Sequence, residues 1–78
     1  MYDEINPSKI GANIRELRKQ HGETAEELAN AINASTSAIN MYENGYRIPR
    51  DEIKIRIAEH YVVPVESIFY TKSQHESC

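Results

Sequence analysis

The chain has 78 residues, a net charge of −3 at neutral pH and an apolar fraction of 40%. That length allows one small domain with a single core. No apolar run is long enough to span a bilayer, and the first residues lack the charged-then-apolar pattern of a secretory signal. A single cysteine, Cys78, cannot form an internal disulfide, so we expect a reducing, cytoplasmic setting.

The first part of the chain predicts two helices. After a loose lead over residues 1–6, Pro7 suits the first turn of a helix, because its missing N–H would be unpaired there anyway. Apolar residues then recur at helical spacing until about Gly22, which can end the helix in a left-handed cap. A second helix begins at Thr24, where the T-x-x-E pattern is a capping box.

A sharp turn and a third helix follow. Asn33 can adopt the left-handed backbone that such a turn requires, and the small Ala29 lets the second and third helices cross closely. Ser35 is a good N-cap and Gly45 a good stop, so a helix is predicted over residues 35–44.

The third helix has two different faces. Ile39 and Tyr42 lie on one side and are expected to join the core. The other side is expected to face solvent and consists of Thr36, Ser37, Asn40 and Met41. A helix, a tight turn and a second helix with one free face are the layout of a DNA-reading helix-turn-helix.

The remaining residues predict two more helices. A loop over residues 46–50 leads into a fourth helix that runs to about Tyr61. Pro64 can open a short fifth helix that ends near Tyr70, and the polar residues 71–78 are expected to form a disordered tail. No segment shows the alternation typical of a strand, so the predicted fold class is all-α with five helices.

From Ile10 to Phe69, the chain resembles the Xre/Cro-type helix-turn-helix family, the lambda-repressor-like DNA-binding domains. The matching pieces, in chain order, are IGANIRELR, ETAEELANAI, ASTSAINMYENGYRIP and IAEHYVVPVESIF. The resemblance implies a five-helix DNA-binding domain over residues 7–70, with residues 35–44 as a recognition helix in the major groove.

The resemblance also implies roles for single residues. Arg18 would pair with Glu43, and this ion pair would fix the recognition helix. Contacts with base edges are expected from Thr36, Ser37, Asn40 and Met41. Contacts with phosphates are expected from Arg18, Thr24, Ser35, Asn44, Arg47 and Arg50. Asp51 and Lys54 stand where the family usually has apolar residues, so Ile53 and Ile55 are expected to be repacked or exposed.

The chemistry of these side chains suits base reading to different degrees. The amide of Asn40 can pair with adenine through two hydrogen bonds, which is worth roughly 1–3 kcal/mol of discrimination. Met41 can pack on a thymine methyl, or it is an ordinary surface residue. The hydroxyls of Thr36 and Ser37 either bond DNA or only help to cap the helix.

Net charge is the feature that fits DNA binding least, because phosphate contacts supply much of the affinity. The basic residues can nevertheless gather on one side of the domain: Arg15, Arg18, Lys19, Arg47 and Arg50. The acidic Glu23, Glu26 and Glu27 suit the positive end of the second helix, and we expect them to turn away from DNA.

The sequence predicts no enzyme, cofactor or metal site. His21, His60 and His75 are scattered and have no second ligand at metal spacing. Ser35 and Ser37 have no neighbouring histidine that could activate them.

We therefore predict a sequence-specific regulator of bacterial or phage type that binds double-stranded DNA, with repression as its default effect. Two-fold dimers read two half-sites, so a homodimer is expected. Its predicted interface consists of Tyr61, Val62, Val65, Phe69 and Tyr70, for which core packing is the alternative role. The alternative function is a protein-interaction module, such as an antitoxin or a partner of another regulator.

Overall fold

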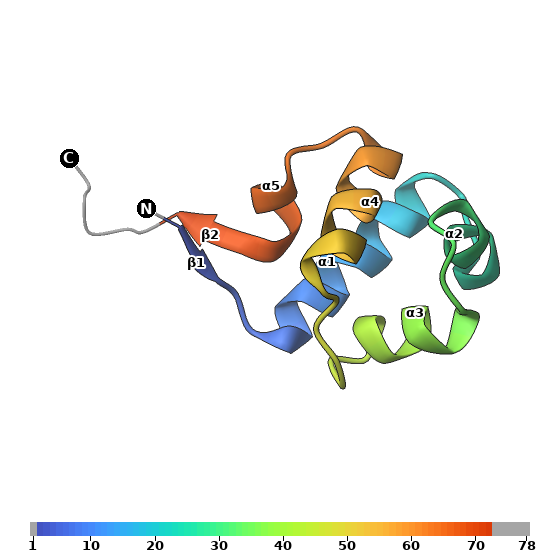
Figure 1. Ribbon diagram of the computed structural model, residues 1–78, viewed down its shortest axis with the longest axis horizontal. Helices are drawn as coiled ribbons and strands as arrows, with labels where there is room; N and C mark the ends of the chain where they lie inside the picture. The colour runs from blue at the N-terminus through green and yellow to red at the C-terminus, as the bar shows by residue number, and fades with distance from the viewer. Residues whose placement is uncertain (1, 73–78) are drawn as a thin grey trace.

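The computed structural model describes residues 2–72, which form five helices and two short strands. The helices are α1 (Pro7–Gln20), α2 (Ala25–Ala31), α3 (Thr36–Glu43), α4 (Asp51–Tyr61) and α5 (Val65–Phe69), and the strands are β1 (Tyr2–Glu4) and β2 (Tyr70–Lys72). Figure 1 shows the helices gathered into one body, with the two strands projecting from one end. The predicted five-helix domain is confirmed. No helix within residues 2–72 has the length and apolarity needed to cross a membrane.

Local signals start the first three helices where the sequence places them. Asn6 caps α1 by accepting a hydrogen bond from the Lys9 N–H at 2.8 Å. At α2 both bonds of the capping box are present, because Thr24 Oγ1 accepts from the Glu27 N–H and the Glu27 carboxylate accepts from the Thr24 N–H. Asn33 has a φ of 59°, which is the left-handed conformation expected for the turn before α3.

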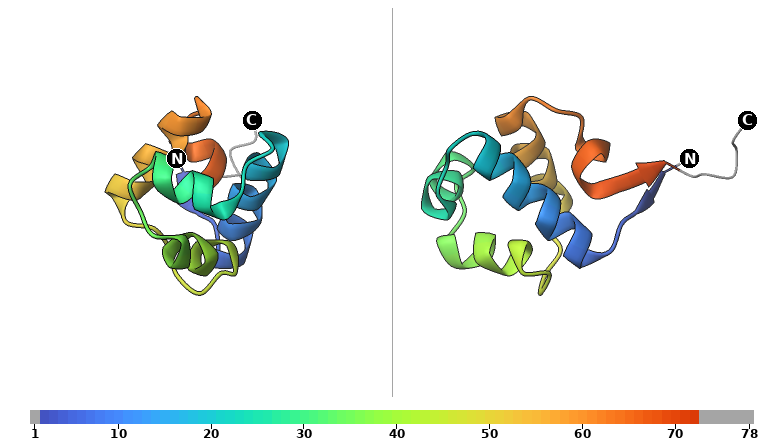
Figure 2. Two further views of the ribbon diagram at one scale, coloured as in Figure 1. Left: turned by 90° about the vertical axis from the view of Figure 1, so that its right-hand side faces the viewer. Right: turned by 180° about the vertical axis from the view of Figure 1, so that it is seen from behind.

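The core lies where the five helices meet. Its members are Ile10, Ile14, Leu28, Ala29, Ile32, Ile39, Tyr42, Ile57, Ala58, Tyr61, Ile68 and Phe69. Helix α1 contacts α3 and also α5, and Figure 2 shows it running across the molecule in the view from behind. Because each fully buried aliphatic or aromatic side chain contributes about 1.5–3 kcal/mol, this cluster fixes the position of α3 against the rest of the fold.

A glycine decides how closely α1 approaches α3. A Cβ atom at Gly11 would lie 2.5 Å from the carbonyl oxygens of both Tyr42 and Glu43, in the last turn of α3. That separation is shorter than any ordinary carbon–oxygen contact, so only glycine allows the two backbones to come this close. The sequence pattern did not single out this residue.

In place of the expected loose lead and part of the expected tail, the structure has two short strands. Strand β1 pairs antiparallel with β2, with Tyr2 opposite Lys72. The Ile5 N–H extends the ladder by donating to the carbonyl of Phe69 at 3.2 Å. The ordered domain therefore extends beyond residues 7–70 on both sides. Of the residues predicted to form a tail, 71–72 belong to β2, and 73–78 lie outside the described residues.

Lys54 is buried between α4 and the start of β2. Only 5% of the residue is exposed, and its ammonium group donates to the Tyr70 hydroxyl at 3.1 Å. The same group lies 4.9 Å from the centroid of the Tyr70 ring, where the π-electrons favour a cation. Because Lys54 takes the inward position, its neighbour Ile55 is turned outward and is 51% exposed.

Candidate nucleic-acid interface

Helix α3 has one face in the core and one face in solvent. Ile39 is fully buried and Tyr42 is 7% exposed. The residues predicted to contact bases are all exposed, namely Thr36, Ser37, Asn40 and Met41. In Figure 1, α3 lies along the lower edge of the molecule, and no other element covers its lower side. The structure thus brings the four residues together on an accessible surface.

The first turn of α3 is capped by Ser35. Its hydroxyl oxygen accepts a hydrogen bond from the Ala38 N–H at 3.0 Å. Since Ser35 makes the cap, the hydroxyls of Thr36 and Ser37 are not needed for that purpose. The structure thus leaves Thr36 and Ser37 as exposed polar residues in the first turn of α3.

An ion pair ties α1 to the end of α3. The Arg18 guanidinium donates to both Glu43 oxygens, from Nε at 2.7 Å and from Nη2 at 3.0 Å. Its third nitrogen, Nη1, donates to the carbonyl of Glu23 at 2.8 Å. The Glu43 side chain is 3% exposed and that of Arg18 is 17% exposed. The hydrogen bond to Glu43 raises the pKa of Arg18 above its usual value.

These contacts revise the expected role of Arg18. The resemblance implied a contact with phosphate as well as the pair with Glu43. All three nitrogens of the guanidinium have protein partners, and the side chain is mostly buried. We therefore assign Arg18 to positioning α3, and its expected phosphate contact has no support in the structure.

Arg15 lies beside this pair and is more accessible. Its side chain is 46% exposed, with Nε 3.4 Å from Glu43 Oε1 and Nη2 3.5 Å from the side-chain oxygen of Asn44. From the sequence, Arg15 was expected only to be one of the basic residues on one side of the domain, with no specific contact. Its spacing of three residues from Arg18 was the available signal, because residues so spaced share one face of a helix.

The loop after α3 brings three predicted phosphate contacts together. A hollow of about 430 Å³ separates this loop from the first turn of α3, and Ser35, Arg47 and Arg50 are among the residues that line it. Arg47 and Arg50 are both exposed. Two guanidinium groups and a hydroxyl around one hollow form a set of donors suited to a phosphate.

Thr24 is exposed, but the capping box already engages its backbone N–H and its side-chain oxygen. The backbone N–H of Thr24 already donates to the Glu27 carboxylate at 2.8 Å, and Thr24 Oγ1 accepts from the Glu27 N–H at 3.1 Å. The protein itself therefore supplies a negative group at the start of α2, where a phosphate would otherwise bind.

Glu23 turns toward α4. Its carboxylate accepts from the Tyr61 hydroxyl at 2.6 Å and lies 2.6 Å from His60 Nε2. Burial disfavours the charged form, but the bonds to Tyr61 and His60 outweigh it and lower the pKa of Glu23 below 4.5. Burial first, and then the bond to Glu23, raise the pKa of Tyr61 above its usual value.

The raised pKa of Tyr61 predicts a loss of stability at alkaline pH. The folded chain keeps the phenol protonated, whereas the unfolded chain ionises it above the usual tyrosine pKa of about 10. The protonated Tyr61 phenol therefore contributes its full stabilisation to the folded chain below pH 10 and loses it as the pH rises further. At a pH of about 11 the free energy of unfolding should be lower by about 1 kcal/mol. Thermal melts at about pH 8 and about pH 11 should show a larger drop for the wild type than for Tyr61→Phe. Equal drops would contradict this role of Tyr61.

The predicted dimer residues fall into two groups. Tyr61 and Phe69 belong to the core of the single chain, with 4% and 0% of their surface exposed, so their assignment to an interface is corrected. Val62 is 87% exposed, whereas Val65 and Tyr70 are partly buried. Val65 and Tyr70 also line a hollow of about 190 Å³ beside Ile55.

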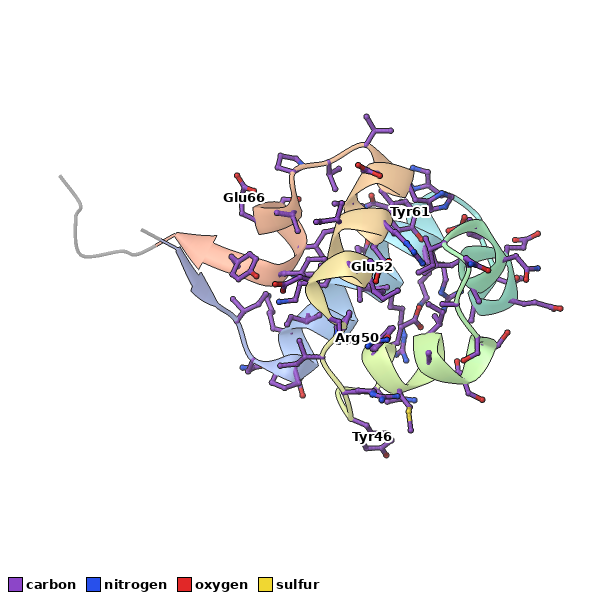
Figure 3. All side chains as sticks on the ribbon, in the orientation of Figure 1. Tyr46, Arg50, Glu52, Tyr61 and Glu66 are labelled. Carbon is purple, nitrogen blue, oxygen red and sulfur yellow. The ribbon has the colours of Figure 1, made fainter. Side chains whose placement is uncertain are left out.

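The exposed arginines beside α3 are opposite in sign to the net charge of the chain. The exposed Arg47 and Arg50 adjoin α3, whereas Glu66 lies on α5 at the far end of the molecule (Figure 3). A net charge of −3 therefore coexists with a basic border around α3.

Comparisons with known proteins agree with this geometry. The helix-turn-helix family matches residues 14–68. The restriction-modification controller protein C.AhdI from Aeromonas hydrophila has a TM-score of 0.75 and 26% identity over 80% of this chain and 94% of its own. PlcR of Bacillus thuringiensis, solved with the peptide PapR7 and DNA, has a TM-score of 0.73 and 26% identity over 78% of this chain and 21% of its own.

A third solved structure bears on the fold alone. SinR, the master regulator for biofilm formation, was solved in complex with DNA and has a TM-score of 0.71 and 23% identity over 76% of this chain and 95% of its own. No curated protein matches the chain. The family match covers more than half of the chain, and the fold and the free face of α3 are consistent with it. The chain thus belongs to the helix-turn-helix family of the Xre and lambda-repressor-like type, a family of DNA-binding transcriptional regulators and not of enzymes.

Proposed function

We propose that this protein is a sequence-specific repressor of bacterial or phage type that binds double-stranded DNA as a homodimer, with α3 in the major groove. The observation that carries the proposal is the free polar face of α3 beside exposed arginines. A helix whose other face is held in the core can enter the groove without disturbing the fold.

Base recognition is assigned to the free face of α3. Asn40 is the strongest candidate, because its amide both donates and accepts and can therefore pair with adenine. Thr36 and Ser37 lie in the first turn, the end of a recognition helix that contacts base edges. Met41 is 42% exposed and offers an apolar contact to a thymine methyl.

Phosphate contacts are assigned to the border of α3. The hollow lined by Ser35, Arg47 and Arg50 would take one phosphate. Arg15 and Asn44, which lie side by side at the other border, would contact another. These contacts fix the register of the helix on the duplex and carry no sequence information themselves.

The proposed dimer follows from the size of the domain. One small module reads a single half-site, whereas a two-fold dimer reads two half-sites about one helical turn apart. The surface available for it contains Ile55, Val65 and Tyr70, which line one hollow. Repression is the simplest effect, because a dimer bound over a promoter blocks polymerase sterically.

A salt-titrated binding assay with random and selected duplexes tests the proposal. The affinity of the wild type should fall steeply on a log–log plot as salt rises, and each selected duplex should bind two copies. Asn40→Ala should lose preference at one base pair, by roughly 5-fold to 150-fold. Arg47→Ala should weaken all duplexes alike and reduce the salt slope by about 1.

The same assay identifies the alternative function. Absent or salt-independent binding to every duplex would contradict DNA recognition and favour a protein-interaction module. Asn40→Ala losses spread evenly over all sequences would contradict its role in base reading.

A further inference from the structure

Apolar side chains are exposed among arginines where the chain leaves α3. We call residues 46–50 the exit loop. Tyr46 is 80% exposed, Ile48 is 37% exposed, and Met41 on the adjoining turn of α3 is 42% exposed. Large hydrophobic residues are exposed at only two other positions in the part of the chain with described side chains, Ile55 and Val62. This concentration differs from the single scattered apolar residues that are normal on protein surfaces.

Hydrogen bonds fix the backbone at Tyr46, whereas its ring is largely exposed. Gly45 has a φ of 78° and donates from its N–H to the carbonyl of Tyr42 at 3.2 Å. The next N–H, that of Tyr46, donates to the carbonyl of Met41 at 2.9 Å. These two bonds form a Schellman cap at the end of α3. Tyr46 is therefore rigidly attached to the recognition helix.

The ring of Tyr46 does not make the contact that usually accompanies this cap. In a Schellman motif the residue at this position often packs its side chain on the last turns of the helix. Here the ring is largely in solvent, and Figure 3 shows it pointing outward at the same lower edge of the molecule as α3. The nearby Arg47 guanidinium instead lies 4.0 Å from the sulfur of Met41.

We propose that Tyr46 is a further DNA-contacting residue, which packs its ring on a deoxyribose and donates its hydroxyl to a phosphate beside the bases read by α3. This inference rests on the proposed function. Tyrosine suits such a place, because its ring is apolar and its tip is a hydrogen-bond donor. Tyr46 lies beyond the end of α3, whereas base edges are contacted mainly by the first turns, so the backbone is its partner.

Equilibrium binding of Tyr46→Ala and Tyr46→Phe to a selected and a random duplex tests the inference. Tyr46→Ala should weaken both duplexes by about 10-fold, and Tyr46→Phe by about 3-fold, because it keeps the ring and loses only the hydroxyl. Neither variant should change the salt slope, since tyrosine is neutral, which separates it from Arg47→Ala. The thermal midpoint should stay unchanged. Gln20→Ala, an exposed neutral change at the end of α1, is the control and should bind as the wild type does.

Three results would overturn the inference. If Tyr46→Ala binds both duplexes like the wild type, Tyr46 makes no contact, while the proposed function stands. If it loses preference at one base pair, Tyr46 reads a base and not the backbone. If the wild type binds no duplex, the proposed function fails first and the inference fails with it. If Tyr46→Ala lowers the thermal midpoint, its binding loss no longer reports the contact alone. Tyr46→Phe, which retains the ring, then tests the hydroxyl contact.

Discussion

Replacing Glu43 by alanine is expected to lower the free energy of unfolding by about 3 kcal/mol, the lower end of the cost of breaking a buried ion pair. The carboxylate is 3% exposed and accepts two hydrogen bonds from Arg18. Its loss leaves a largely buried guanidinium without its counter-charge. The cost is not larger because Arg18 keeps the carbonyl of Glu23 and some contact with water.

The pair between Arg56 and Glu52 provides a matched control for burial. It has the same N–O distance of 2.7 Å, but its side chains are 38% and 69% exposed. Exposed pairs of this kind are worth less than about 1 kcal/mol, so Glu52→Ala should hardly change a thermal or denaturant melt. Equal midpoints for Glu43→Ala and the wild type would contradict the importance of the buried pair.

A double-mutant cycle separates the ion pair from general packing loss. Arg18→Ala combined with Glu43→Ala should cost at least about 1 kcal/mol less than the sum of the two single changes. Additive costs would mean that the two side chains stabilise the fold independently. Because Glu43 ends α3, Glu43→Ala should also weaken DNA binding under conditions in which the protein remains folded.

Replacing Gly11 by alanine is expected to destabilise the fold by about 2–3 kcal/mol, although the same change inside an exposed helix usually stabilises it by about 0.5–1 kcal/mol. The sign is reversed because the new methyl group would lie 2.5 Å from two backbone carbonyls of α3. Backbone atoms cannot rotate away as a flexible side chain can. Either α1 or α3 must move, and the melting midpoint should fall by roughly 10 °C.

Gly22→Ala is the appropriate control for this change. A Cβ atom there would have no neighbour within 4 Å, and the only penalty is the left-handed backbone with its φ of 62°. That penalty is about 1 kcal/mol. If Gly11→Ala is as stable as the wild type, the close approach of α1 to α3 is not needed for the fold.

Short-range interactions account for the features that the sequence alone predicted. The capping box of Thr24 and Glu27, the Ser35 cap and the left-handed Asn33 each depend on residues only a few positions apart. Apolar spacing likewise determines which side of α3 enters the core. The helix-turn-helix and its free polar face could therefore be predicted from the sequence alone.

Apart from the Arg18–Glu43 pair, which the family resemblance implied, interactions between distant parts of the chain had no comparable signal. Residues 2–4 carry no strand pattern, and their pairing with residues 70–72 depends on both chain ends reaching the same side of the helical body. The burial of Tyr61 and Phe69, which removes them from a dimer surface, depends on how α4 and α5 pack together. An apolar residue in a short helix is compatible with either outcome until the packing is known.

The sequence by itself determined the helices, the N-caps of α2 and α3 and the polar face of α3, because hydrogen bonds and periodicity within a few residues specify them. Only the tertiary structure decided that Arg18 is fully engaged, that Arg15 lies beside Asn44 and that Gly11 sets the approach of α1 to α3. The physical reason is that, apart from the bond from Arg18 to the Glu23 carbonyl, these contacts join residues more than twenty positions apart, whose meeting is set by the packing of whole helices.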